Sequence, residues 1–379
     1  MTAARPLRQR IRRLLRFGSS VAGAALIGAL GWVLARASLS VGAFGVREET
    51  RREWLVKAVG ESLARLSYDL PFLAREPMEI PKVCIVYLDE ASAHALDQRG
   101  GVWDRGLHTR LLRKLAREQP RAVYFDIVFD NDAPEVGVDE DFAAAMRECG
   151  NVFLGAAYET DIGLPLPGGT QVVSHSISAP IPALRSAAAG WGLVEFDPVD
   201  GDFGVRRIST GKEERASAAW EMAARLNPDF SNTPEARAQT RWMNYPGPSD
   251  LFPTVRYDHA LAADGTPEGF FRDRIVFIGG RSTLSGVGLG KDDFRNPFGL
   301  LGDRFSTGVE VHLTAMLNLL RGEWLTRIEA RRELWLALGW GILLGGTLPL
   351  FRPHHAALFA ALALVIIYLI VVGIRAVLK

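Results

Sequence analysis

The chain is poor in cysteine and has no excess of charge of one sign, and each shortage excludes a class of protein. Only 2 cysteines occur in 379 residues, too few for a disulfide framework or a four-thiolate zinc site. Lys and Arg number 44 against 43 Asp and Glu, so the basic face of a nucleic-acid binder is not expected. With 48% hydrophobic residues, the chain is also too apolar to be disordered.

Catalytic motifs are scarce as well. The sequence has no Gly-x-Ser-x-Gly turn and no His-Glu-x-x-His pair. The glycine-rich segment 279–290 lacks the Lys-Ser/Thr that ends a phosphate-binding loop. We therefore expect a protein that is not an enzyme, with no cofactor and no metal ion.

Three uncharged stretches are long enough to cross a bilayer. They are Ser19–Ala35, Leu334–Phe351 and Ala356–Ile374, of 17, 18 and 19 residues, and a spanning helix needs about 17–25. We predict transmembrane helices at 19–35, 334–351 and 356–374. The last two would form a hairpin around Arg352–His355.

The N-terminal segment predicts the orientation of these spans. Residues 1–16 contain six arginines and no acid, so residues 1–18 should be a basic cytoplasmic tail under the positive-inside rule. The large segment that follows would then face the periplasm or exterior of a bacterial cytoplasmic (inner) membrane. Ala35-Arg36-Ala37 also resembles a signal-peptide cleavage site; between the two alternatives we favour a retained anchor.

The segment between the first two predicted spans has the pattern of an α/β domain. A periodic stretch at 45–70 predicts a stalk helix, and residues 71–325 alternate apolar strands with helices. This order predicts a mixed, largely parallel sheet flanked by helices. The expected strands are Val83–Leu88, Ala122–Phe129, Val152–Ala157 and Ile275–Ile278; the expected helices are Leu107–Arg117, Glu140–Arg147, Ala216–Leu226 and Gly308–Leu320. We expect loops over 158–190 and a hairpin formed by Gly192–Phe196 and Val205–Ser209.

Acidic residues gather at the ends of the first two predicted strands. Asp89 and Glu90 follow the first strand, Asp126 lies in the second, and Asp130 and Asp132 follow it. If these strands are neighbours, the side chains share the sheet edge at which open α/β folds bind ligands and could hold a divalent cation. The alternative, which we favour, is that Asp89, with Ser92, and Asp132 or Asp139 cap the following helices.

Two further pairs of residues are candidates for a polar site. Trp103 and Arg105 open the first crossover helix, and Arg105 is expected to join Asp89 and Asp126 in one buried cluster or to bind an anion. Glu310 and His312 open a later helix, but a spacing of two puts them on different faces, so a shared metal site is disfavoured. The candidate ligand-binding or structural residues are Asp89, Glu90, Ser92, Trp103, Arg105, Asp126, Asp132, Glu310 and His312.

Several short motifs, in order, resemble the type-2 CHASE domain family (Cyclase/Histidine-kinase-Associated Sensory Extracellular domain, second type). The matching segments are Tyr68-Asp69-Leu70, Ile85–Ser92, Trp103–Leu112, Ala122–Phe129, Asp202–Arg207, Asn244–Gly247, Ile275–Gly279, Asp293–Pro297 and Gly308–His312. The resemblance covers about residues 47–325. The chain departs from the family in having Trp103-Asp104 where an aromatic-Pro pair is usual, and two predicted spans after the sensor where receptors usually have three and an output domain.

The resemblance implies a membrane-anchored extracytoplasmic sensor that binds an unidentified ligand and relays a signal through its transmembrane helices. The expected partners are the lipid bilayer and a separate membrane protein or a second copy in a homodimer. The alternative is a non-catalytic accessory or scaffold subunit of a larger membrane complex. A metal-dependent hydrolase using the acidic edge is the least favoured interpretation.

Overall fold

The computed structural model of the chain describes residues 65–98, 103–165, 171–281, 292–299 and 305–347, with positions 18, 21–25, 29, 62, 355, 358 and 362. The chain divides into two compact units. One is Glu76–Thr326, and the other combines Met1–Arg75 with Arg327–Lys379.

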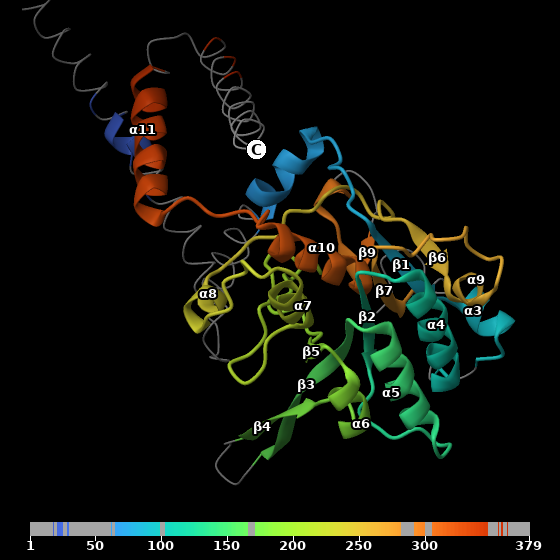
Figure 1. Cartoon of the computed structure of the whole chain (residues 1–379). Coiled ribbons are helices and arrows are strands. Elements are labelled where there is room, and N and C mark those ends of the chain that lie inside the picture. Colours follow the sequence, from blue (N-terminus) through green and yellow to red (C-terminus); the bar gives the residue numbers. More distant parts are fainter. Residues whose placement is uncertain are drawn as a thin grey trace, which may run out of the picture. The chain divides into compact units, whose positions relative to one another are not determined.

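The centre of the Glu76–Thr326 unit is a mixed sheet (Figure 1). Its described strands lie in the order β4-β3-β2-β7-β1-β6, with β5 paired to β3. All of these pairings are parallel except that of β4 with β3. The strands are β1 (Val83–Leu88), β2 (Ala122–Val128), β3 (Val152–Pro165), β4 (Gln171–Ser178), β5 (Gly190–Leu193), β6 (Thr254–Arg256) and β7 (Ile275–Gly280). The prediction of a largely parallel sheet is confirmed.

Helices cover both faces of this sheet. On one face, α4 (Arg105–Glu118), α5 (Val138–Cys149), α6 (Pro182–Ala187) and α9 (Tyr257–Leu261) share a core with alternate residues of the strands, such as Val123 and Phe125 of β2. On the other face lie α7 (Ala218–Leu226) and α10 (Gly308–Arg321), which pack on each other and on β5 and β7 (Figure 1). Strands covered on both faces are continuously apolar, which explains why β1, β2 and β7 were recognisable in the sequence.

Smaller elements complete this unit. They are α3 (Glu90–Ala95), α8 (Pro234–Ala238), a two-stranded sheet of β8 (Asp293–Arg295) and β9 (Phe305–Thr307), and the 3₁₀ turn η3 (Pro297–Gly299). Helix α10 begins at a capping box, in which Thr307 and Glu310 satisfy each other's backbone N–H groups, and it is followed by Gly322 in the left-handed conformation.

Two of the expected local structures are wrong. Residues 158–190, expected to be loops, contain the second half of β3, strand β4 and helix α6. The glycines and prolines at 163–169 lie near or after the end of β3, and Pro182 is the first residue of α6, where a proline is tolerated. The expected hairpin of Gly192–Phe196 with Val205–Ser209 does not form: β5 instead pairs in parallel with β3, and Arg207 bridges to Trp242. Pairing of β5 with the buried strand β3 was therefore more favourable than the predicted local hairpin.

In the second unit, the described helical residues include 21–25, 65–69, the 3₁₀ turn η2 (Leu70–Ala74) and α11 (Ala330–Thr347). None of the helices in the described part of the chain has both the length and the mean hydropathy that a membrane crossing requires. The predicted spans at 19–35 and 356–374 and the stalk at 45–70 fall mostly outside the described residues, and the span at 334–351 is described only as far as residue 347.

Candidate functional site

Polar residues meet where the carboxyl ends of β2 and β7 reach the first turn of α10. Close approach of this helix depends on Gly279, because a Cβ there would lie 2.9 Å from Val309 and 3.1 Å from the Cβ of Asp126. The carboxyl edge of a parallel sheet is where open α/β folds bind ligands. Two predicted site residues, Asp126 and His312, come together here.

Strand alternation decides which way Asp126 points. Its neighbour Phe125 lies in the core beneath α4 and α5, so Asp126 faces the opposite side, towards α10. The Asp126 carboxylate accepts a hydrogen bond of 3.2 Å from Tyr124 and lies 3.6 Å from Nε2 of His312. The imidazole of His312 stacks on Phe196 at 4.2 Å between ring centres and hydrogen-bonds to the backbone of Val194.

Burial shifts both members of this pair towards their neutral forms. Loss of water raises the pKa of Asp126, and the nearby His312 only partly offsets the effect. Loss of water likewise lowers the pKa of His312, while Asp126, Glu195 and Asp292 oppose the shift. The pair therefore lies in a low-dielectric setting whose protonation responds to any charge brought next to it.

A small hollow opens beside His312. Its described lining comes from the residues after β5, the segment 205–209, Met243, and helices α7 and α10 with the residue before α7. The lining residues are Glu195, Phe196, Val205, Arg207, Ser209, Ser217, Ala219, Met243, Val311, His312 and Ala315. Glu195 binds the amide of Tyr158 through Oε1, while its Oε2 is buried and has no hydrogen-bond partner among the described residues. A buried carboxylate oxygen without a donor is unusual in folded proteins, so a small donor, such as a water molecule or the donor group of a ligand, is expected at this oxygen.

Glu310 lies on another face of α10, as its spacing from His312 predicts. Its carboxylate accepts hydrogen bonds from the amides of Asp250 at 3.1 Å and Thr307 at 3.2 Å. Tyr87 bonds the hydroxyl of Thr307 at 3.1 Å. Burial raises the pKa of Glu310, and its contacts tie the first turn of α10 to the neighbouring loop.

The acidic residues after β1 and β2 do not form one edge cluster, because β7 lies between the two strands. Asp89 caps α3 by accepting the amide of Ser92 at 2.7 Å, as the capping alternative predicts. Glu90 is the first residue of that helix, and the Ser92 hydroxyl binds Asp258 at 2.9 Å. Asp132 is exposed and does not cap α5, whose N-cap is Gly137.

The expected cluster of Asp89, Asp126 and Arg105 is wrong. Arg105 pairs instead with Asp139 of α5 and with the backbone carbonyl of Asn131. The reason is geometric: Arg105 lies with α4 and α5 on one face of the sheet, whereas Asp126 points to the other face. Trp103, at the start of the same crossover, packs edge-on against Tyr257 at 5.0 Å between ring centres.

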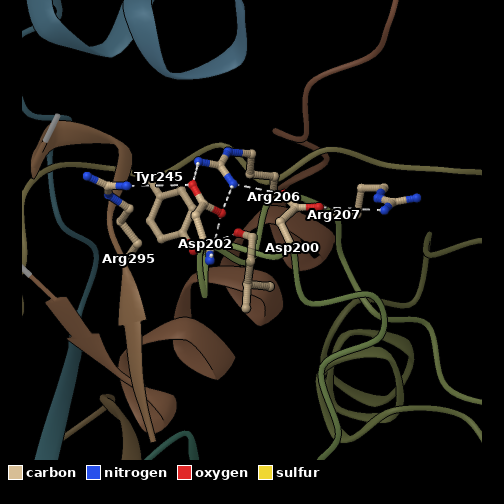
Figure 2. A network of polar contacts seen from close by, with 8 residues as sticks. Asp200, Asp202, Arg206, Arg207, Tyr245 and Arg295 are labelled. Atoms are coloured by element: carbon tan, nitrogen blue, oxygen red, sulfur yellow. Dashed lines mark hydrogen bonds and ion pairs between the residues drawn. The ribbon is translucent and has the colours of Figure 1, made fainter. Parts of the chain in front are cut away.

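The structure also contains an ion-pair network that sequence reasoning missed. Figure 2 shows Arg206 between Asp200 and Asp202, with Arg207 and Arg295 outside them. Arg206 is 4% exposed and donates to both carboxylates at 2.8–2.9 Å. Val205–Ser209 was expected only as one strand of a hairpin; Asp200 and Asp202 followed by Arg206 and Arg207 were the available signal.

One further motif has no catalytic geometry. Ser209-Thr210-Gly211-Lys212 matches the Ser-x-x-Lys pattern of some acyl-transfer enzymes. The ammonium of Lys212 is bound by Asp197 and lies over the Tyr158 ring, so in the described part of the chain it contacts these residues and not Ser209. Within the described residues, no three His, Cys, Asp or Glu side chains are grouped to hold a metal ion.

Comparison with known proteins gives a family match. A family model described as the CHASE2 domain matches residues 39–348, which is most of the chain and includes every residue of the candidate site. No curated protein and no solved structure matches the chain.

Proposed function

We propose a sensory function for this chain because it belongs to the CHASE2 domain family, whose members are extracellular sensory domains. In this proposal the Glu76–Thr326 unit is an extracytoplasmic, ligand-binding domain without enzymatic activity. Residues 19–35, 334–351 and 356–374 anchor it in the membrane and relay its signal to a separate membrane partner.

The observation that carries the proposal is the hollow beside His312 at the carboxyl edge of the sheet. It combines a buried carboxylate oxygen of Glu195, which has no donor among the described residues, with His312, which lies 3.6 Å from Asp126. A ligand that donates a hydrogen bond or carries positive charge would satisfy Glu195. The same ligand would change the field on His312, whose pKa already responds to Glu195.

Helix α10 offers a route from this hollow towards the C-terminal segment. Its first turns carry Glu310 and His312, it ends at Arg321, and α11 begins at Ala330. A rigid helix of 14 residues is about 21 Å long. A ligand that favours one position of α10 would bias the chain that follows, by no more than its difference in affinity for the two positions.

Topology is tested by labelling single cysteines on intact cells. In a chain in which Cys84 is replaced by Ala and Cys149 by Ser, we expect Val136→Cys to react with an impermeant thiol reagent, since Val136 is fully exposed. Thr2→Cys, in the basic N-terminal segment, should react only after lysis. Protection of Val136→Cys, or recovery of the chain in the soluble fraction, would contradict the membrane-anchored topology.

Relay is tested on the partner that copurifies in mild detergent. A Gly-Ser insertion after Arg327 should leave the partner bound but uncouple its activity from the sensory unit. Glu195→Gln should also change that activity, because it alters the hollow. If neither change alters the partner while the complex remains stoichiometric, the chain is a scaffold subunit and the sensory proposal fails.

A further inference from the structure

The two outer strands of the sheet differ in how well their edges are protected. An outer strand presents unpaired N–H and C=O groups to any extended chain, and natural proteins usually protect it with charged residues, prolines or short length. Strand β6 has all three features: it is 3 residues long, follows Pro253, and ends at Arg256. It also continues directly into α9.

Strand β4 has none of these protections. It is 8 residues long, with the sequence QVVSHSIS, and contains no Asp, Glu, Lys, Arg or Pro. It pairs with β3 along one side, and no strand pairs with its other side in the described part of the chain. Figure 1 places β4 at the outer end of the sheet, beyond β3. Positions 173–176 are exposed, including Val173 at 50%.

We propose that β4 pairs antiparallel with β4 of a second copy of this chain, so that one sheet continues across a homodimer. The partner must be an extended strand, because only another strand matches a row of alternating donors and acceptors. An uncharged strand offers no charge by which to select a foreign partner. When two copies of β4 lie side by side, no like charges oppose each other. Pairing of the two copies about a two-fold axis also gives a closed dimer.

The charged side chains of β4 and of its neighbour β3 are compatible with this pairing. The acids of these two strands, Glu159 and Asp161, lie on β3, and Glu159 accepts a hydrogen bond of 2.8 Å from Ser178 of β4. His175 of β4 interacts with β3: it forms a hydrogen bond with Thr160 and stacks on Tyr158. The exposed positions 173–176 of β4 therefore carry no acid, lysine or arginine that would oppose pairing through the backbone.

The size of this contact indicates where pairing should occur. A ladder of 8 residues is about 27 Å long, and by itself it is smaller than the interface of a stable soluble dimer. Confinement in a membrane would supply the missing effective concentration, and this step alone rests on the proposed anchoring. Dimers are therefore expected in membranes and weak association in dilute detergent.

The experiment is disulfide cross-linking of the full chain in membranes, again with Cys84 and Cys149 replaced. Single cysteines at 173, 174, 175 and 176 are oxidised in turn, with Thr254→Cys on the β6 edge as the matched exposed control. We expect a band of twice the chain mass that is strongest at one β4 position and at least threefold weaker at Thr254→Cys. Adding Val173→Lys to the chain with a cysteine at 174, 175 or 176 should reduce its band at least threefold, whereas adding Thr254→Lys to the same chain should not.

Three results would overturn the proposal: equal cross-linking at β4 and Thr254, no band at any β4 position, or a cross-linked product whose mass shows a different protein. Failure of membrane anchoring is distinguished from these because it appears as soluble protein during fractionation. The position dependence of cross-linking is then measured on the soluble chain at high concentration, where its absence equally rejects β4 pairing.

Discussion

Removing the guanidinium of Arg206 should destabilise the sensory unit more than removing any exposed charge. Arg206 is 4% exposed and donates hydrogen bonds to Asp200 at 2.9 Å and to both oxygens of Asp202 at 2.8 Å. The two carboxylates are themselves only 20% and 18% exposed. Arg206→Met keeps most of the side-chain volume but leaves the two mostly buried carboxylates with only the more distant Arg207 and Arg295, each at 3.8 Å (Figure 2).

The magnitude follows from this burial. Breaking a buried ion pair by removing one partner costs about 3–5 kcal/mol. Because both carboxylates keep some contact with water, we expect the lower end, about 3 kcal/mol. For a unit of this size, that corresponds to a fall in Tm of about 6–12 °C. Lys82→Met is the control, since the Lys82–Asp273 pair is 69% and 63% exposed and should contribute less than about 1 kcal/mol.

Urea unfolding of the full chain in mild detergent, followed by tryptophan fluorescence, measures both variants. The triple variant Arg206→Met, Asp200→Asn, Asp202→Asn should recover part of the loss, because it removes the unpaired charges along with the arginine. If Arg206→Met is as stable as Lys82→Met, the network is solvated and the reasoning is wrong. If the triple variant is less stable than Arg206→Met, charge burial is not the source of the loss.

The remaining predictions concern other buried contacts. In urea unfolding, Asp139→Asn should lower the free energy of unfolding by about 3 kcal/mol, because it removes the partner of Arg105. Asp141→Asn is the control: Asp141 is 72% exposed, and its loss should change the free energy of unfolding by less than about 1 kcal/mol. Equal values for the two variants would reject the buried pair. Burial, assisted by Arg105, lowers the pKa of His108 to about 3, so stability should fall as pH drops below the unfolded value of about 6.5, by about 2 kcal/mol at pH 5. His108→Met should flatten that pH profile, and parallel profiles would contradict it. In thermal melts, Gly211→Ala should lower the free energy of unfolding by over about 2 kcal/mol, because φ is +94° and a Cβ would lie 2.3 Å from a backbone oxygen. In the same melts, Gly137→Ala should lower it by only about 1 kcal/mol, because the added Cβ would meet open space.

The sequence by itself determined the elements whose signal is local or strongly periodic. Strand β1 forms at the predicted Val83–Leu88, and α4, β2, α5, α7, β7 and α10 lie within a few residues of their predicted bounds. Continuous apolar runs indicate strands covered on both faces, and helical spacing of leucines indicates a packed face, so both can be recognised without knowing the neighbours. The same local logic predicted the Asp89 cap and the separation of Glu310 from His312.

Tertiary structure decided everything that depends on which elements become neighbours. The sequence could not show that β7, about 150 residues after β2, enters the sheet between β1 and β2 and separates the acidic strand ends. It could not show that Asp126 faces α10 whereas Arg105 faces α5, because the side of a strand is fixed only when its helices have packed. Burial then raises the pKa of Asp126, lowers the pKa of His312 and leaves Glu195 with an oxygen that has no donor among the described residues. A residue's desolvation depends on the whole set of atoms around it, and only the folded chain brings those atoms together.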